Sequence, residues 1–177
     1  MKLILIRHGE TTGDLENRYG GSYDDHLTDT GRAQLVETAT RLKSKEIETI
    51  YHSPLIRAQE SAHIIAEHIG CELVEISGLQ ERSYGVLSGL TKEEALEKYP
   101  DAVEMHKDYM NTDPEGESYV DFEKRVLSAF VEIKAAFSGE VLTILAHGGS
   151  LKRILDHLGE PLPDSIADGG IIEVNLT

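Results

Sequence analysis

Short runs of apolar residues alternate along the chain with longer segments in which apolar residues recur every three or four positions. The runs predict buried strands over residues 2–6, 49–52, 72–76, 141–146 and 171–176. The helical spacing predicts helices over residues 35–42, 55–69, 122–137 and 151–158. Strands that alternate with helices predict an α/β fold, a three-layer sandwich with a mostly parallel central sheet flanked by helices.

No internal repeat, low-complexity tract or flexible linker divides the sequence. A chain of 177 residues has the length of one ordinary domain, so we expect residues 1–177 to form a single domain. The least regular stretch, from Tyr99 to Ser118, contains Pro100, Pro114 and Gly116 and predicts a long loop or a short helical excursion. In an α/β protein such an insertion commonly overhangs the functional site.

Acidic residues outnumber basic ones. The 32 Asp plus Glu against 17 Lys plus Arg give a formal net charge of −15, which repels phosphate backbones and anionic lipid, so we expect no nucleic-acid and no membrane partner.

The single cysteine, Cys71, cannot form an internal disulfide. The first apolar run has only four residues, too few for a signal-peptide core or a membrane span. These features predict a cytoplasmic protein.

Polar residues with catalytic chemistry follow the predicted strands. Open α/β sheets bind ligands at the carboxyl ends of their strands, so the residues that follow each strand are the candidates for a functional site. The residues in question are Arg7 and His8 after the first strand, Ser53 and Arg57 after the second, Glu81 after the third, and His147, Gly148 and Gly149 after the fourth. Two histidines, two arginines and one glutamate are therefore expected at one edge of the sheet.

This set of side chains suits phosphoryl transfer. A neutral imidazole is a competent nucleophile toward phosphorus, and a guanidinium matches the oxygens of phosphate. A carboxyl group such as that of Glu81 can protonate the departing oxygen and later deprotonate water. Ordinary structural interpretations stay open: a surface ion pair for Arg7, a hydrogen-bonded core histidine for His147, and one carboxylate among many for Glu81. Their coincidence at successive strand ends favours catalysis.

Four motifs, in this order, resemble those of the histidine phosphatase superfamily in its phosphoglycerate mutase-like branch: Arg7-His8-Gly9-Glu10-Thr11, Ser53-Pro54-Leu55-Ile56-Arg57-Ala58, Leu79-Gln80-Glu81 with Tyr84-Gly85, and Ala146-His147-Gly148-Gly149. The resemblance covers essentially the whole chain. It implies that His8 is the nucleophile that becomes phosphorylated and that Glu81 donates the proton. It also implies that Arg7, Arg57 and His147 form the phosphate pocket, with no metal and no cofactor.

The acceptor of the phosphoryl group separates two activities in this family, because water gives a phosphatase and a sugar-acid hydroxyl gives a mutase. The segment Glu81-Arg82-Ser83-Tyr84-Gly85 resembles the mutase form of its motif, and Lys92 stands where mutases have a ligand-binding lysine. Residues 100–118 contain no arginine, whereas mutases carry a paired arginine there. We therefore expect a metal-independent phosphomonoesterase acting on small phosphorylated metabolites. The alternatives are a cofactor-dependent phosphoglycerate mutase and a non-catalytic module that binds phosphorylated ligands.

The loop from Asp14 to His26 departs from the family pattern. Asp14 stands where the family usually has an asparagine that donates toward phosphate, and a carboxylate there would repel the ligand. Three alternatives are open: Asp14 turns away, it contacts a hydroxyl or ammonium of the substrate, or Asn17 takes the donor role. The residues expected to bind substrate are Asp14, Arg18, Gly21, Ser22, Tyr84, Lys92 and Gly148. The expected partner is a small-molecule phosphate ester, and the sequence leaves a homodimer open.

Overall fold

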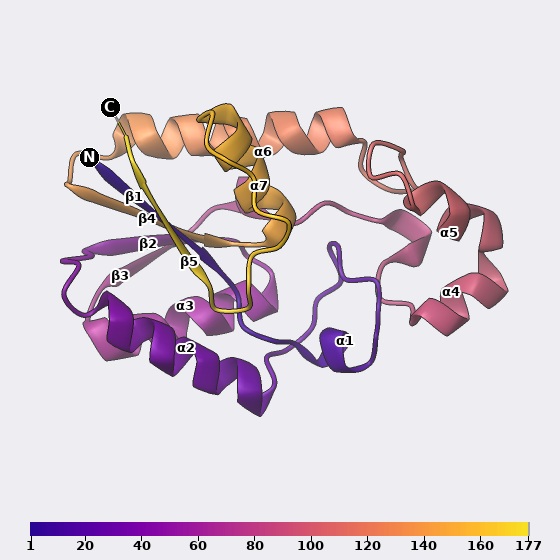
Figure 1. Cartoon of the computed structure of the whole chain (residues 1–177), viewed down its shortest axis with the longest axis horizontal. Coiled ribbons are helices and arrows are strands. Elements are labelled where there is room, and N and C mark those ends of the chain that lie inside the picture. The colour runs from indigo at the N-terminus through magenta and orange to yellow at the C-terminus, as the bar shows by residue number, and fades with distance from the viewer. Residues whose placement is uncertain (177) are drawn as a thin grey trace.

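A computed structural model describes residues 1–176 and contains one five-stranded sheet with the strand order β3-β2-β4-β1-β5 (Figure 1). The strands are β1 (Lys2–Arg7), β2 (Thr49–His52), β3 (Glu72–Glu75), β4 (Val141–Ala146) and β5 (Ile171–Asn175). The pairs β1–β4, β2–β4 and β2–β3 are parallel, and β5 runs antiparallel to β1. The sheet is therefore mostly parallel, as the sequence predicts.

Helices cover both faces of the sheet, which confirms the three-layer sandwich. Helices α2 (Asp29–Leu42) and α3 (Ile56–Ile69) pack on one face, and α6 (Tyr119–Ala136) and α7 (Gly148–His157) pack on the other (Figure 1). Side chains of β1 alternate between two core clusters: Leu3 and Leu5 pack with α6 and α7, whereas Ile4 and Ile6 pack with α2 and α3. A strand buried on both faces needs consecutive apolar residues, and the four central residues of β1, Leu3 to Ile6, have this pattern.

The helices begin earlier than the apolar spacing predicts. Helix α2 starts at Asp29 after the N-cap Thr28, and α6 starts at Tyr119 after the N-cap Ser118; each cap side chain accepts a hydrogen bond from a backbone N–H of the first turn. First turns of this kind are polar, so periodicity alone does not detect them. Helix α7 likewise starts at Gly148, whereas α3 and the strand ends agree with the expected bounds to within one residue.

A small lobe that the sequence shows only in part lies beyond the end of the sheet (Figure 1). It contains the short helical turns η1 (Ser77–Leu79) and η2 (Gly85–Leu87) and the helices α4 (Lys92–Lys98) and α5 (Pro100–His106). Helix α5 confirms the helical alternative for residues 99–118, and α4 and the short α1 (Thr12–Leu15) were not predicted. A separate cluster of buried residues stabilises the lobe: Tyr19, Leu87, Ala95 and Ala102.

The edge strand β3 is less buried than the sequence predicts. Glu72 and Glu75 are exposed, and so is the apolar Val74. Strand β3 pairs with β2 alone, and polar residues on an edge strand discourage pairing with other chains.

Within residues 1–176, none of the helices combines the length and the apolar character needed to cross a membrane.

Candidate active site

The two histidines predicted at strand ends lie side by side. Strands β1 and β4 pair in register, with Arg7 opposite Ala146, so the next residues, His8 and His147, also come together. Their ring centroids are 5.2 Å apart, and the rings are tilted by 54°. Both side chains are buried. The central parallel pair of strands therefore sets the distance between the two imidazoles.

Hydrogen bonding defines the reactive nitrogen of His8. Its Nδ1 lies 2.8 Å from the carbonyl oxygen of Gly9, which can only accept, so Nδ1 carries the proton and Nε2 carries the lone pair. Burial lowers the pKa of His8 well below its usual value, and the charges of Arg57 and Arg7 lower it further. The imidazole is therefore neutral at physiological pH, the form that can act as a nucleophile.

His147 presents its other ring nitrogen to the site. Its Nε2 lies 2.7 Å from Ser53 Oγ, and that hydroxyl also accepts the N–H of Leu55. Ser53 is then free to donate its proton to Nε2, which leaves the proton of His147 on Nδ1. Within the described chain, His147 Nδ1 and Arg7 Nε are buried and have no hydrogen-bond partner. Buried polar groups are nearly always hydrogen-bonded, so two unpartnered donors indicate a place where an anion binds.

The two arginines of the site are held by other parts of the chain. Arg57 donates to the carbonyl oxygen of Gly21 at 2.7 Å, to that of Tyr23, and to Asp25 Oδ1 at 2.9 Å. Arg7 donates to the carbonyl oxygen of Ile166, and its Nη2 lies 3.1 Å from Asp168. A guanidinium has five N–H donors, so each arginine keeps donors for a ligand after these bonds are made. The contacts fix where those remaining donors point.

Glu81 is fixed by two backbone amides. Its Oε1 accepts the N–H of Arg82 at 2.9 Å, and its Oε2 accepts the N–H of Gly149 at 2.8 Å, in the first turn of α7. A Cβ at position 149 would lie 2.3 Å from Glu81 Oε1, so any side chain there would displace the Glu81 carboxyl. The motif that ends in Gly148-Gly149 and the motif that contains Glu81 thus come together at one point.

The residues described so far border a cavity of about 220 Å³, which we call the inner chamber. Its wall contains His8, both arginines and Glu81, and the ring of His147 lies next to that of His8. The lining residues are Arg7, His8, Thr11, Gly13, Asp14, Arg18, Gly20, Gly21, Asp25, Arg57, Glu81, Tyr84 and Gly148. Nine of the twelve expected site residues therefore line this chamber, and a tenth, His147, lies beside the lining residue His8.

Asp14 uses one carboxylate oxygen within the protein. Its Oδ2 accepts hydrogen bonds from the backbone N–H and the hydroxyl of Thr11, each at 2.9 Å, and this pair caps the short helix α1. Arg18 is held by Glu16 and by the carbonyl oxygen of Gly89 at 2.6 Å. Asn17 has a left-handed backbone, with φ of 53°, and is not among the residues of the chamber wall. The capping bond accounts for an aspartate at position 14.

Two expected substrate-binding residues, Ser22 and Lys92, lie outside the walls of the chamber and of the outer pocket described next. Lys92 is the first residue of α4, and its Nζ lies 3.0 Å from the centroid of the Tyr19 ring. Burial lowers the pKa of this lysine. The structure therefore gives Lys92 a packing role in the lobe and does not bring it to the chamber.

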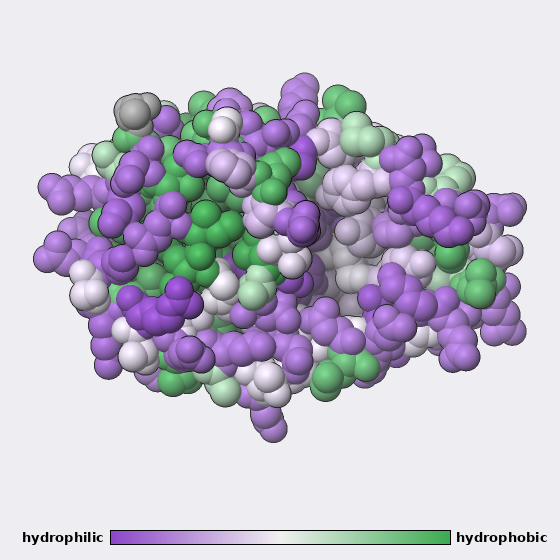
Figure 2. Space-filling view, in the orientation of Figure 1, coloured by the Kyte–Doolittle hydropathy of each residue, from purple (hydrophilic) through white to green (hydrophobic). Residues whose placement is uncertain are grey.

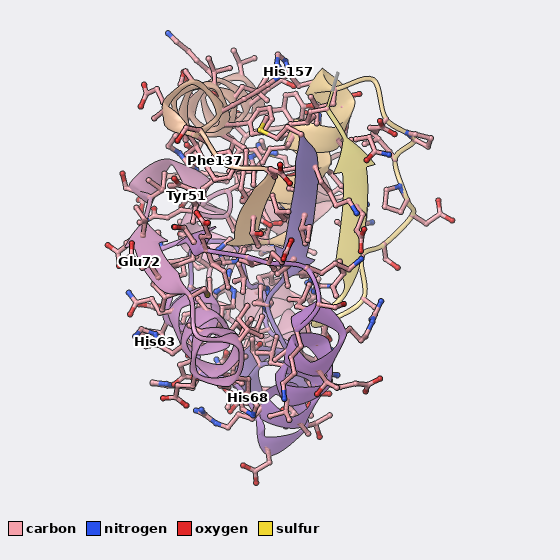
Figure 3. The ribbon with its side chains drawn as sticks, turned by 90° about the vertical axis from the view of Figure 1, so that its left-hand side faces the viewer. Tyr51, His63, His68, Glu72, Phe137 and His157 are labelled. Carbon is pink, nitrogen blue, oxygen red and sulfur yellow. The ribbon has the colours of Figure 1, made fainter. Side chains whose placement is uncertain are left out.

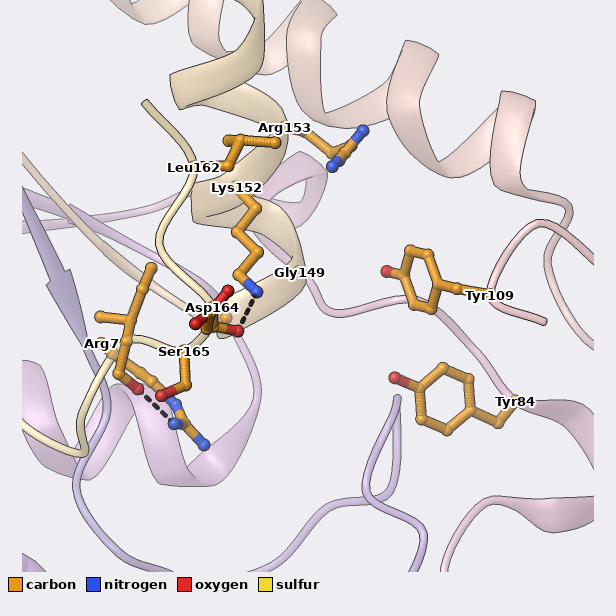
Figure 4. A pocket seen from close by; sticks show the side chains of 11 residues that line it. Arg7, Tyr84, Tyr109, Gly149, Lys152, Arg153, Leu162, Asp164 and Ser165 are labelled. Atoms are coloured by element: carbon orange, nitrogen blue, oxygen red, sulfur yellow. Dashed lines mark hydrogen bonds between the residues drawn. The ribbon is translucent and has the colours of Figure 1, made fainter. Parts of the chain in front are cut away.

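A larger pocket opens from the inner chamber; we call it the outer pocket (Figure 4). Its volume is about 460 Å³, and it shares Arg7, Tyr84 and Gly148 with the chamber. Figure 2 shows the surface hollowed between the body that carries the sheet and the lobe. The other lining residues are Tyr109, Gly149, Lys152, Arg153, Leu162, Asp164, Ser165 and Ile166. Sequence reasoning marked Gly149 and, without naming the residue, the segment 99–118 that contains Tyr109; it missed the others because no motif marks them.

Arg82 holds the far wall of the outer pocket in place. Its guanidinium donates to the carbonyl oxygens of Tyr109, Asn111 and Glu117, and the side chain is buried. Arg82 therefore ties the segment between α5 and α6 to the residue next to Glu81. Only its place in the Glu81-Arg82 motif signals this role in the sequence.

The exposed histidines of α3 lie far from the site. His63 and His68 project from the outer face of this helix (Figure 3). Each Nδ1 contacts the carbonyl oxygen four residues earlier, at 2.8 and 2.7 Å. Among residues 1–176 no group of three or more His, Cys, Asp or Glu side chains is arranged to hold a metal ion.

Known proteins resemble this chain in sequence and in fold. Residues 3–170 match the family model of the histidine phosphatase superfamily (branch 1). The chain is 33% identical to a 2,3-bisphosphoglycerate-dependent phosphoglycerate mutase of Parvibaculum lavamentivorans, over 98% of this chain and 85% of that protein. It is 35% identical to a metal-independent phosphoserine phosphatase of Arabidopsis thaliana, over 86% of this chain and 66% of that protein. Among solved structures, Bacillus stearothermophilus YhfR matches with a TM-score of 0.89 and 28% identity, covering 99% of this chain and 91% of that one.

Proposed function

The chain belongs to the histidine phosphatase superfamily (branch 1), and from this premise we propose that it is a metal-independent phosphomonoesterase that acts through a phosphohistidine on His8. The observation that carries the proposal is the state of His8: a buried, neutral imidazole with its Nε2 lone pair free, on the wall of a chamber lined by two arginines. The proposal places the reaction in the cytoplasm, on small phosphate esters.

In the first half-reaction, the phosphate of the ester binds in the inner chamber. The remaining N–H groups of Arg7 and Arg57, with His147 Nδ1, bind its oxygens, where negative charge is spread in the transition state. His8 Nε2 attacks phosphorus, a nitrogen–phosphorus bond forms, and the bond to the ester oxygen breaks. Glu81 gives its proton to the departing oxygen, so the alcohol leaves neutral.

In the second half-reaction, water replaces the alcohol beside Glu81. The carboxylate takes one proton from the water as its oxygen attacks phosphorus. The nitrogen–phosphorus bond breaks, its electron pair returns to Nε2, and inorganic phosphate leaves. Glu81 regains the proton it lost, so the cycle balances without a further reactant. The amides of Arg82 and Gly149 hold this carboxyl in the same place in both steps.

Two features favour a phosphatase over a mutase. Residues 100–118 contain no arginine to hold the carboxylate of a phosphoglycerate, and Lys92 lies outside the chamber and the outer pocket. One relative is named as a metal-independent phosphoserine phosphatase. Another is named as a mutase, so the test must separate release of phosphate from its transfer.

The test compares the wild type with His8→Ala in excess chelator, measuring phosphate released from phenyl phosphate. We expect chelator-resistant release by the wild type and loss of turnover in the variant, because no neighbouring side chain can replace the nucleophile. Acid-quench labelling with a ³²P-ester should leave label on the wild type only. Undiminished release by a clean His8→Ala preparation would remove His8 from the reaction. Isomerisation of phosphoglycerate without phosphate release would indicate a mutase.

A further inference from the structure

We propose that the outer pocket binds the alcohol portion of the substrate and selects an uncharged, hydroxylated ring, such as that of a sugar phosphate. This inference rests on the proposed phosphatase activity and concerns the substrate class. Besides Arg7, Tyr84 and Gly148, which the pocket shares with the inner chamber, it uses residues outside the four sequence motifs: on α7, on the segment after α7 and on the segment between α5 and α6. Four observations support it.

The first observation is the position of the pocket. It opens from the inner chamber past Arg7, Tyr84 and Gly148, so an ester whose phosphate fills the chamber extends its alcohol into the pocket. Glu81 lies close enough for its charge to add to the rise in pKa that burial causes at Tyr84 and Tyr109. Glu81 lines the inner chamber and accepts the N–H of Gly149, a residue of the outer pocket wall, so the proton donor lies next to the pocket that receives the leaving alcohol.

The second observation is the mixture of groups on the walls. The hydroxyl groups of Tyr84 and Tyr109 point across the pocket toward Lys152 of α7 and toward Asp164 and Ser165 in the segment after that helix (Figure 4). Burial raises the pKa of Tyr109 to about 12, so its hydroxyl stays protonated and can donate. Sugar rings present both donors and acceptors together with apolar C–H faces. The phenol rings, with Leu162 and Ile166, match those faces.

The third observation is the charge balance, which argues against a second anionic group on the substrate. Three cations line the pocket, and two of them already face carboxylates. Arg7 lies 3.1 Å from Asp168, and Arg153 lies 3.5 Å from both Glu123 and Asp156.

Lys152, the third cation, donates to the main-chain carbonyl oxygen of Asp164 at 2.7 Å, and the carboxylate of Asp164 is itself on the wall. Three cations are thus set against four carboxylates, and no positive charge is left in surplus for a carboxylate or a second phosphate of the substrate. An uncharged alcohol portion avoids this conflict.

The fourth observation is size. The outer pocket is about twice the volume of the inner chamber, 460 against 220 Å³, and falls in the range of sites that enclose ligands larger than a three-carbon chain. A three-carbon alcohol would reach few of these walls. A ring of five or six atoms can contact Tyr109 and Lys152 at once.

The experiment measures kcat/KM for ribose 5-phosphate, glucose 6-phosphate, 3-phosphoglycerate and phenyl phosphate. We expect the sugar phosphates to exceed 3-phosphoglycerate by at least about tenfold, which is the discrimination of one buried hydrogen bond or one unpaired charge. Tyr109→Phe keeps the ring and removes the hydroxyl. It should lower kcat/KM for the sugar phosphates about threefold to tenfold more than for phenyl phosphate, which has no hydroxyl groups.

Lys152→Met should show the same selective loss, and Lys124→Met, exposed on the outer face of α6, is the matched control that should change no ratio. Equal losses for sugar phosphates and phenyl phosphate, or a preference for 3-phosphoglycerate, would overturn the inference. If the wild type releases phosphate from none of the four esters, the proposed function fails instead. Hydrolysis of phenyl phosphate with no preference for sugar phosphates would leave the function standing and refute the substrate class.

Discussion

Removal of Asp25 tests how the inner chamber is held together. The carboxylate of Asp25 and the guanidinium of Arg57 are 2.9 Å apart, and their side chains are only 3% and 4% exposed. Taking one partner from a buried ion pair leaves the other charge buried without compensation, which costs about 3–5 kcal/mol. Arg57 keeps the carbonyl oxygens of Gly21 and Tyr23, so we expect the lower end of this range for Asp25→Ala, about 3 kcal/mol.

Asp25→Asn is the informative second variant, because it keeps an oxygen acceptor and loses the charge. In this variant the amide oxygen still accepts a hydrogen bond from the charged Arg57, and a bond with one charged partner contributes about 1.5–3 kcal/mol. The ion pair contributes more than that, so we expect Asp25→Asn to lower the free energy of unfolding by about 1–2 kcal/mol. The matched control is Glu104→Gln, which breaks the exposed ion pair with Lys107 and should leave stability unchanged.

Urea unfolding at pH 7 measures the three variants against the wild type. A domain of this size is stable by about 5–15 kcal/mol, so a loss of 3 kcal/mol moves the midpoint well beyond experimental error. The expected order of stability is wild type and Glu104→Gln, then Asp25→Asn, then Asp25→Ala. If Asp25→Ala unfolds at the same midpoint as Glu104→Gln, the buried pair does not hold Arg57 and the reasoning is refuted.

Three further predictions follow from the site and the lobe. Burial lowers the pKa of His8 and His147, so both are neutral in the folded protein and take up protons on unfolding when the pH is low. The free energy of unfolding should therefore be highest above about pH 6.5, the pKa of an unfolded histidine, and should fall as the pH drops below it. A urea midpoint that does not change between pH 8 and pH 5.5 would contradict this. Gly149→Ala places a Cβ 2.3 Å from Glu81 Oε1 and should lower kcat about 100-fold or more, because it displaces the proton donor. A folded variant with the wild-type kcat would show that catalysis does not depend on holding the Glu81 carboxyl in this position. Lys92→Met removes the ammonium from the Tyr19 ring and should cost about 0.5–1 kcal/mol in urea unfolding; an unchanged midpoint would show that this contact stabilises nothing.

The sequence predicted the sheet and the meeting of polar residues at the carboxyl ends of its strands. A continuous apolar run such as residues 3–6 indicates a strand buried on both faces, and polar residues that follow parallel strands meet at one edge of the sheet. The structure places His8, Arg57 and Glu81 together on the wall of the inner chamber, where that argument expects them. Their roles in turnover stay predictions until the variants are measured.

The substrate pocket could not be predicted, for a physical reason. Its walls come from irregular segments whose side chains meet through long-range contacts, such as Arg82 with the carbonyl oxygen of Tyr109. Leu162 and Asp164 lie between α7 and β5, where neither periodicity nor spacing marks them. Lys92 illustrates the opposite error: its position in the sequence suggested a ligand, whereas the start of α4 directs it to Tyr19.

The place of β1 and β4 inside the sheet has a consequence for the order in which the protein opens. Each has a neighbour on both sides, whereas β3 and β5 are at the edges. The residues of β1 and β4 are almost all buried, whereas those of β3 are largely exposed, so the amide hydrogens of β1 and β4 should exchange most slowly with solvent and those of β3 soonest. His8 and His147 follow the two inner strands directly. Opening of the edge strand β3 therefore leaves the ladder between β1 and β4, and with it the two imidazoles, in place.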